Sequence, residues 1–271
     1  MPAERPSLQE SYYDEDVNYR FGSPHLSHWG LYERLVAIVR TCIGNLEGAG
    51  LEPDVLEIGA GHGGFTEPVL AAGCRVTAVE ASRPSLHTLQ HRYGTNPGFD
   101  TIYDPDGSLE GVKGTYSLVL IVAVLHHIPD YVSFLDRVTR LLAPGGSLLT
   151  LQDPLWYARL PGRAHLLNRG GYYLWRLGQG NARQAISTLS RRVRGVHDAT
   201  NPADMVEYHV VRDGVDERSV TELLRGRFES VELIPYWSNQ LGAVQQLGER
   251  LGLANSFGVL ATGYAPPASA S

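Results

Sequence analysis

The chain has 271 residues, 43% of them hydrophobic and 19% charged, which is enough to bury the core of one α/β domain with insertions or of two small domains. Its net charge of −6 does not suit a general nucleic-acid surface. Its two cysteines, Cys42 and Cys74, form no metal-binding or disulfide motif, so we expect no metal site and a reducing, cytoplasmic compartment.

The N-terminal stretch and the apolar runs of the chain predict no membrane segment. Residues 1–10 are polar, do not read as a signal peptide and are expected to be disordered. The longest apolar run, residues 118–125, is far too short to span a bilayer. Residues 11–30 are rich in aromatic side chains, and apolar residues at helical spacing predict a helix over residues 31–43.

Residues 54–58 predict a short buried strand, because only Glu57 interrupts its apolar run. A strand that leads through a glycine turn into a helix is typical of a nucleotide-binding crossover. The helix is expected to begin near residue 64 or 65, since Pro68 is tolerated only in a first helical turn. Four glycines within six positions make up the predicted turn: Gly59, Gly61, Gly63 and Gly64.

The ligand of this turn is indicated by Glu57, which lies two residues before the first glycine. A carboxylate there suits a positively charged ligand and repels a pyrophosphate. The glycine spacing also satisfies the dinucleotide fingerprint, so an NAD-dependent enzyme stays an alternative, as does a turn without a ligand. Residues 54–66 resemble the first motif of class I S-adenosylmethionine-dependent methyltransferases, acidic-x-Gly-x-Gly-x-Gly. The resemblance implies S-adenosylmethionine, which carries an ammonium and a sulfonium but no phosphate, as the cofactor.

The next two predicted strands each end at an acidic residue. The strand over residues 75–81 contains Glu80 near its end. A carboxylate there is placed to accept hydrogen bonds from two ribose hydroxyls, whether the ligand is S-adenosylmethionine or NAD. The alternative is a surface glutamate without a ligand. A capped helix over residues 82–93 precedes a third strand over residues 99–103. The resemblance implies that Asp104, with Asp106 as second choice, accepts from the adenine amino group, although Asp-Pro-Asp-Gly is also a strong turn sequence.

The most apolar predicted strand covers residues 116–125 and is expected at the centre of the sheet. A helix from Asp130 to residue 142 and a fifth strand over residues 147–152 follow it. This order resembles the second half of a class I methyltransferase core and is not expected of a dehydrogenase. The resemblance places the donor against these residues: Glu57, Gly59, Ala60, Gly61, Glu80, Ala81, Asp104, Val122 and Ala123.

The remaining chain predicts a Rossmann-like, doubly wound, mostly parallel seven-stranded sheet with a helical insertion after the fifth strand. A helix is expected over residues 216–225, strands over 228–235 and 256–264, and a small helical element between these two strands. The resemblance suggests that the last strand is antiparallel. We divide the chain as follows: an N-terminal helical lid at 1–50, a core at 51–152 and 216–265, a substrate-binding insertion at 153–215 and a disordered tail at 266–271.

His126 and His127 follow the central strand, at the edge where an open α/β sheet binds its ligands. Methyl transfer to a hydroxyl is assisted by a general base, and histidine suits proton transfer near neutral pH. Both histidines are therefore candidate catalytic residues, with packing against the next helix as the alternative. His62, inside the glycine turn, is a candidate neighbour of the donor.

The insertion is basic and aromatic, with eight arginines and no Asp or Glu over residues 154–197. It predicts an apolar acceptor pocket with a handle for an anionic or carrier-bound substrate, or else a solvated face that pairs with the acidic core. We therefore expect O-methylation of a small hydrophobic metabolite in natural-product biosynthesis, by a monomer or homodimer without nucleic-acid or membrane partners. N- or C-methylation, a donor-binding cyclase and an NAD-dependent oxidoreductase remain the alternatives.

Overall fold

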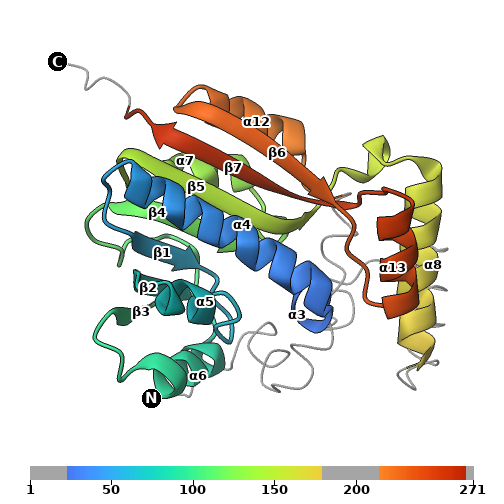
Figure 1. Cartoon of the computed structure of the whole chain (residues 1–271), viewed down its shortest axis with the longest axis horizontal. Coiled ribbons are helices and arrows are strands. Elements are labelled where there is room, and N and C mark those ends of the chain that lie inside the picture. Colours follow the sequence, from blue (N-terminus) through green and yellow to red (C-terminus); the bar gives the residue numbers. More distant parts are fainter. Residues whose placement is uncertain (1–22, 179–213, 267–271) are drawn as a thin grey trace.

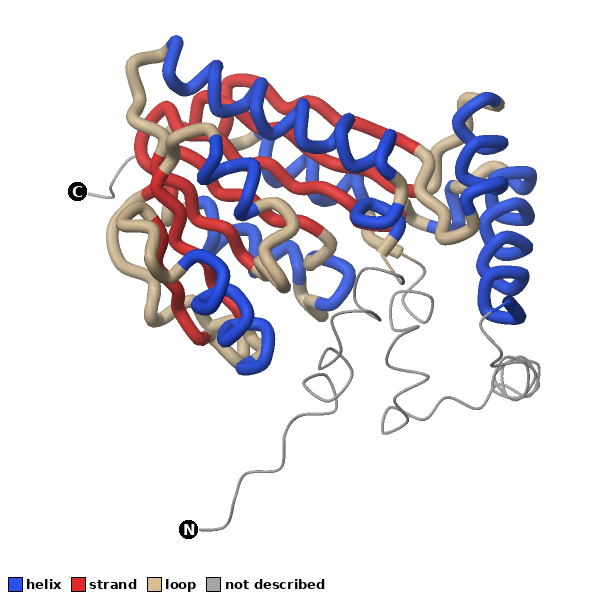
Figure 2. Tube along the Cα trace, turned by 60° about the horizontal axis from the view of Figure 1, so that its bottom comes forward, coloured by secondary structure: helices blue, strands red, loops and turns tan. Residues whose placement is uncertain are grey.

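The computed structural model describes residues 23–178 and 214–266, which form one seven-stranded sheet with helices on both faces (Figures 1 and 2). The strand order is β3-β2-β1-β4-β5-β7-β6. The first five strands of this order are parallel, and β7 is antiparallel to both of its neighbours. The predicted fold class is thus confirmed. The strands are β1 (Asp54–Ile58), β2 (Arg75–Glu80), β3 (Phe99–Tyr103), β4 (Tyr116–Val122), β5 (Leu142–Pro154), β6 (Phe228–Tyr236) and β7 (Ser256–Tyr264).

Helices cover both faces of the sheet, as a parallel sheet requires for the burial of its strands (Figures 1 and 2). Helices α4 (Trp29–Gly48) and α5 (Thr66–Ala71) lie on one face, while α7 (Tyr131–Thr139) and α12 (Glu217–Arg225) lie on the other. Helix α6 (Arg83–Tyr93) connects β2 to β3 and packs against β3.

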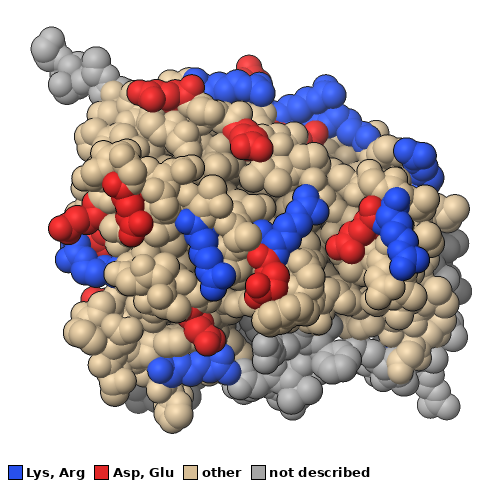
Figure 3. Space-filling model, in the orientation of Figure 1, with Lys and Arg blue, Asp and Glu red and all other residues tan. Residues whose placement is uncertain are grey.

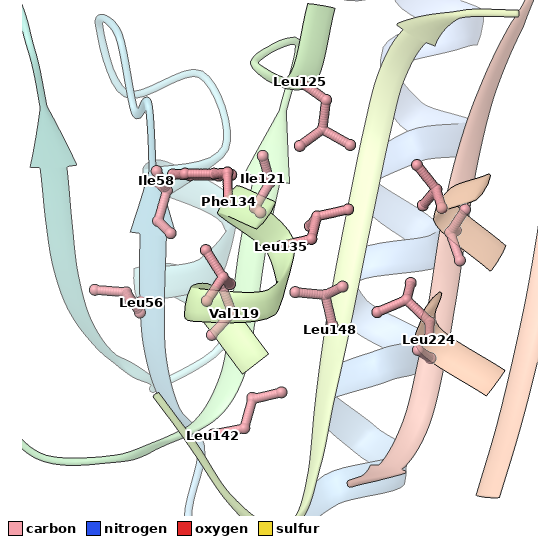
Figure 4. Close-up of a cluster of buried hydrophobic side chains, with 14 of the residues drawn as sticks. Leu56, Ile58, Val119, Ile121, Leu125, Phe134, Leu135, Leu142, Leu148 and Leu224 are labelled. Atoms are coloured by element: carbon pink, nitrogen blue, oxygen red, sulfur yellow. The ribbon is translucent and has the colours of Figure 1, made fainter. Parts of the chain in front are cut away.

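Alternate side chains of the central strands divide between two hydrophobic clusters. In β4, Val119 and Ile121 pack towards α7, with Leu56 and Ile58 of β1 beside them (Figure 4). The other side chains of β4, Leu118, Leu120 and Val122, lie in the second cluster, under α4. The unbroken apolar run that predicted a central strand therefore serves two cores at once.

The N-termini of three helices carry side-chain caps, two of which were expected from the sequence. Ser82 accepts from the Ser85 N–H (3.3 Å) at the start of α6, and Asp130 accepts from the Ser133 N–H (3.1 Å) at the start of α7. Asp216 caps α12 in the same way. Each cap satisfies backbone donors that the helix itself cannot satisfy, which explains why these helices begin close to the predicted residues.

Two predicted strand boundaries are wrong. Strand β4 ends at Val122 and not at residue 125, because the chain turns at Ala123 (φ +58°) into the short helix η1 (Leu125–His127). Strand β5 begins at Leu142 and not at residue 147, since Leu142 already pairs with Tyr116 before a register shift. The second difference arises from pairing between distant segments, which local sequence patterns do not report.

Three helical elements from distant parts of the sequence lie at the end of the molecule where the parallel strands terminate (Figure 1). They are α3 (Pro24–Ser27), α8 (Gly162–Gly178) and α13 (Gly242–Arg250). Helix α8 confirms helical structure within the predicted insertion, whereas the predictions for residues 1–10, 179–213 and 267–271 lie outside the described residues. Within residues 23–178 and 214–266, no helix has the length and apolar character needed to cross a bilayer.

Candidate active site

The candidate site lies at the carboxyl ends of β1 and β4, where the strand order reverses direction along the sheet. Open α/β sheets bind ligands at such a switch point, because the connections on either side leave in opposite directions. The two loops touch: a Cβ on Gly59 would overlap Cγ2 of Val124, and Gly59 has φ +72°. Only glycine satisfies both conditions at this position.

The glycine turn is also tight against its other neighbours. Gly63 has φ +85°, and a Cβ there would overlap the ring of Tyr93 from α6. A Cβ on Gly64 would lie 2.7 Å from Cδ2 of Leu26 in α3. The Tyr32 hydroxyl donates to the Gly64 carbonyl (2.9 Å). Leu26 of α3 and Tyr32 of α4 therefore contact the turn directly, while the role of residues 1–50 as a lid stays a prediction.

Glu57 lies on β1 beneath the turn and is buried. The Thr66 hydroxyl donates to one of its carboxyl oxygens (2.5 Å). Burial raises the pKa of Glu57 to about 8, with the Thr66 hydrogen bond acting against the shift and the neighbouring Glu80 adding to it. A positively charged ligand near this carboxyl would stabilise its ionised form, whereas a phosphate would oppose it.

Glu80, at the end of β2, joins the loops that follow β1 and β2. It accepts from the Gly61 N–H (2.7 Å) and from the Ser82 N–H (2.9 Å), one on each oxygen. Burial raises its pKa, and these backbone donors oppose the shift. The carboxyl group is thus held in a fixed position between two loops, with exposed Ala81 beside it. Its further lone pairs suit the ribose contact that the sequence predicts.

Asp104 follows β3 and is used within its own turn. Its carboxyl group accepts from the Ser108 hydroxyl (3.3 Å) and from the Leu109 N–H (3.1 Å). The turn chemistry considered from the sequence is therefore present, while the adenine contact of Asp104 stays a prediction. Asp106 is exposed, and hydrogen bonds from Ser108 lower its pKa.

The other predicted donor neighbours sit at the bases of the same loops. Ala60 is buried in a small hydrophobic cluster with Ala78 and Leu89, so it packs the turn against β2 and α6. Val122 is buried at the end of β4, and Ala123 follows it in the left-handed backbone region. A non-glycine residue in this region is strained, and such strain is often found beside ligand sites.

His126 lies on η1, directly beyond β4, and makes the most specific polar contact of the site. Its ring Nδ1 is 2.8 Å from Oδ1 of Asp153, which is fully buried at the end of β5. The rings of His126 and His127 are 4.1 Å apart between centroids. Burial lowers the pKa of His126 to about 4 and that of His127 well below its usual value. Both rings are therefore neutral near pH 7, as a general base must be.

Sequence reasoning missed Asp153 as a partner of His126. The available signal was positional: an aspartate at the end of β5 lies at the same edge of the sheet as a residue that follows β4. His25 of α3 also lies near this pair: burial lowers its pKa, and the charge of His126 lowers it further. No three His, Cys, Asp or Glu residues in the described ranges are grouped closely enough to hold a metal ion.

Comparison with known proteins agrees with this geometry. The family model described as "Methyltransferase domain" matches residues 56–148, which run from the middle of β1 into β5. Over these residues the chain matches a methyltransferase domain. The resemblance expected from the glycine turn and from the segment after β4 is thus confirmed.

Curated relatives match over the same part of the chain. The ubiquinone biosynthesis O-methyltransferase of Caulobacter sp. (strain K31) is 34% identical over 98 residues, which are 35% of this chain and 38% of that protein. The enzyme of the same name from Caulobacter vibrioides is 34% identical over 95 residues, 34% of this chain and 37% of that protein. The match therefore spans little more than a third of these relatives.

Solved structures match along nearly the whole chain. The N-methyltransferase NodS from Bradyrhizobium japonicum WM9, in complex with S-adenosyl-L-homocysteine, is 16% identical with a TM-score of 0.55 and covers 96% of this chain and 97% of its own. The plantazolicin methyltransferase BpumL, also bound to S-adenosyl-L-homocysteine, is 12% identical with a TM-score of 0.55 and covers 94% of both chains. Identities this low show a common fold.

The contact between Gly59 and Val124 can be tested against a matched glycine. Gly73 has a similar backbone conformation (φ +84°), but a Cβ there would meet nothing within 4 Å. Gly73→Ala should lower the free energy of unfolding by about 1–2 kcal/mol through backbone strain alone. Gly59→Ala adds an overlap and should lower it by about a further 1–3 kcal/mol. Urea unfolding of both variants measures the difference, and equal losses would contradict the close contact.

Proposed function

We propose that this protein transfers a methyl group from S-adenosylmethionine to the hydroxyl oxygen of a small hydrophobic metabolite. The observation that supports the proposal most directly is the glycine turn at the switch point, with the buried carboxyl groups of Glu57 and Glu80 on either side of it. A methyltransferase domain matched by its family model over residues 56–148 is consistent with this chemistry.

The residues of the turn fit such a donor. Gly59 and Gly63 let the turn pack closely against Val124 and Tyr93, because a Cβ at either position would overlap these side chains. Glu80 is the proposed acceptor for the ribose hydroxyls of the donor. The carboxyl group of Glu57 provides negative charge for a cationic donor without the like-charge repulsion that a pyrophosphate would meet.

Bound S-adenosylmethionine supplies a methyl group on a positively charged sulfur, which leaves as a neutral thioether once the attacking oxygen takes the methyl group. The protein therefore needs to align the acceptor, exclude water and remove one proton. His126 is the proposed base: its neutral imidazole accepts the hydroxyl proton and later returns it to solvent. His127 is the second candidate, since its ring lies against that of His126.

The acceptor is proposed to bind beside α8, which lies beyond the carboxyl ends of the strands (Figure 1). Helix α8 exposes Leu166 and Leu174 and carries a cluster of aromatic rings that includes Tyr172 and Trp175. These side chains suit an apolar acceptor. The natural-product character of the acceptor follows from this apolar surface and remains part of the proposal.

Some arginines of the insertion form ion pairs with the core, and others are proposed to bind the acceptor. Arg159 donates to Glu217 (2.9 Å) and also pairs with Asp216, so it joins the insertion to α12. Arg176 stands over the Tyr172 ring, 5.7 Å from its centroid. On the face shown in Figure 3, positive and negative side chains alternate, as expected of a solvated surface. We assign the anionic handle of the acceptor to Arg169 and Arg176 of α8.

Donor binding should be measurable by calorimetry and should depend on pH. Because burial raises the pKa of Glu57 to about 8, this carboxyl group must lose its proton to stabilise a cationic ligand. The affinity for S-adenosylmethionine should therefore rise between pH 6 and 8, by up to about tenfold per pH unit for one proton released. Glu57→Gln should flatten this dependence. Tight binding of NAD without binding of S-adenosylmethionine would contradict the proposed donor.

The proposed base is tested with a hydroxyl-bearing acceptor. His126→Ala should lower kcat by about 10²–10⁴-fold, because proton removal would then depend on water, while the donor affinity stays close to that of the parent. His127→Ala identifies whether the second ring shares this role. Turnover at the parental rate in both variants would show that neither histidine is the base and would favour transfer to nitrogen or carbon. Donor binding without any transfer would favour the cyclase alternative.

The role of α8 is tested by reversing two charges. The double variant Arg169→Glu/Arg176→Glu should raise the KM for an acceptor that carries a carboxylate or phosphate by about tenfold or more, since attraction becomes repulsion. Arg163→Glu, on the first turn of the same helix, provides the control for charge alone. The KM for S-adenosylmethionine should not change. Acceptor kinetics identical to those of the parent would show that these arginines have a structural role.

A further inference from the structure

Asp153 has one oxygen in use and one without a partner. Its Oδ1 accepts from the backbone N–H of His126 (3.1 Å) and lies 2.8 Å from the ring Nδ1 of the same residue. Its Oδ2 is buried and has no hydrogen-bonding partner among the described residues. Burying a carboxyl group with an unsatisfied oxygen is costly, and an asparagine would satisfy the backbone contact equally well. A carboxyl group differs from an amide in that its ionised form can offset a positive charge on the His126 ring beside it.

We propose that Asp153 is a positioning residue, which holds the His126 ring with its proton on Nδ1 and offsets the positive charge that forms when Nε2 accepts a proton from the acceptor. The inference rests on the proposed function for its catalytic part. A hydrogen bond from Nδ1–H to a carboxylate selects one tautomer of a neutral imidazole and leaves Nε2 as the basic nitrogen. The same bond stabilises the imidazolium, because the two opposite charges are then in contact.

The electrostatics of the pair agree with this role. Burial raises the pKa of Asp153 to about 8 and lowers the pKa of His126 to about 4, since each group in isolation resists charge in this environment. When Asp153 is ionised, the pair has a net negative charge. A proton taken up by the pair makes it neutral overall, whereas a proton taken up by an isolated buried histidine creates a charge. Proton uptake by the pair is thereby favoured over uptake by a buried histidine alone.

Other titratable groups border the pair from three elements. They are His25 of α3, His127 of η1 and Tyr236 of β6, whose ring lies 5.8 Å from the guanidinium of Arg34. Burial lowers the pKa of both histidines, and burial together with the nearby Asp153 raises the pKa of Tyr236. All three side chains are therefore neutral near pH 7 and add no formal charge beside the pair.

The decisive variant is Asp153→Asn, which keeps the size of the side chain and removes its charge. Nitrogen-15 NMR of the histidine rings, without donor or acceptor, should show His126 protonated on Nδ1 in the parent. In the variant we expect a mixture of tautomers and a lower imidazole pKa. Asp130→Asn is the matched control, because asparagine caps a helix as well as aspartate does, and should leave both readouts unchanged. An unaltered tautomer and pKa in Asp153→Asn would overturn the proposal.

Kinetics test whether the effect passes through His126. With a hydroxyl acceptor, Asp153→Asn should lower kcat by about 10²–10⁴-fold at constant KM for the donor, and Asp153→Glu should recover part of the loss. In the His126→Ala background, Asp153→Asn should cause no further loss, because two residues that act as a unit are not additive. Independent, additive losses would overturn the proposal. A parent that binds no S-adenosylmethionine would overturn the proposed function, and the NMR result would still decide the tautomer role.

Discussion

The close approach of the loops after β1 and β4 is the constraint on which the site depends. Gly59 touches Val124, and both Gly59 and Ala123 adopt left-handed backbone conformations. The two loops leave the sheet on opposite sides of the switch point, and Gly59 and Val124 meet between them. The glycine turn, η1 and the residues that they carry take their positions from this one contact.

Four acidic side chains are buried along the same edge of the sheet, and each is held by donors from a neighbouring segment. Glu57 accepts from Thr66, Glu80 from two backbone N–H groups, Asp104 from its own turn and Asp153 from His126. A buried carboxyl group destabilises a fold unless its oxygens are hydrogen-bonded. Buried carboxyl groups gathered at one edge of a sheet are typical of a ligand site.

The helical elements around the site are joined to the core by polar contacts. In α8, Asn168 accepts from the side-chain amides of Asn239 and Asn255, which lie in the segments before and after α13. Gln152, beside Asp153, donates to Ser238 (2.6 Å) and extends this network to β5. A buried amide network specifies one arrangement, because a shift by one residue would leave several donors unsatisfied. The position of α8 relative to the strand ends is therefore set by hydrogen bonds as well as by packing.

The sequence by itself determined the features that depend on local chemistry. The apolar run of β4, the glycines after β1, the caps Ser82 and Asp130, and the order of strands and helices all follow from short-range propensities and periodicity. These features also carried the resemblance to class I methyltransferases. They were sufficient for the fold and for the loops at which we propose that the donor binds.

Only the tertiary structure decided the features that depend on partners far apart in the chain. The early start of β5 arises from pairing with β4. Arg159 forms ion pairs with Asp216, the N-cap of α12, and with Glu217 in its first turn. The contact between Asp153 and His126 joins residues 27 positions apart at the ends of adjacent strands. No local pattern encodes such a contact, because it arises from the parallel alignment of β4 and β5, which brings their carboxyl ends to one edge of the sheet.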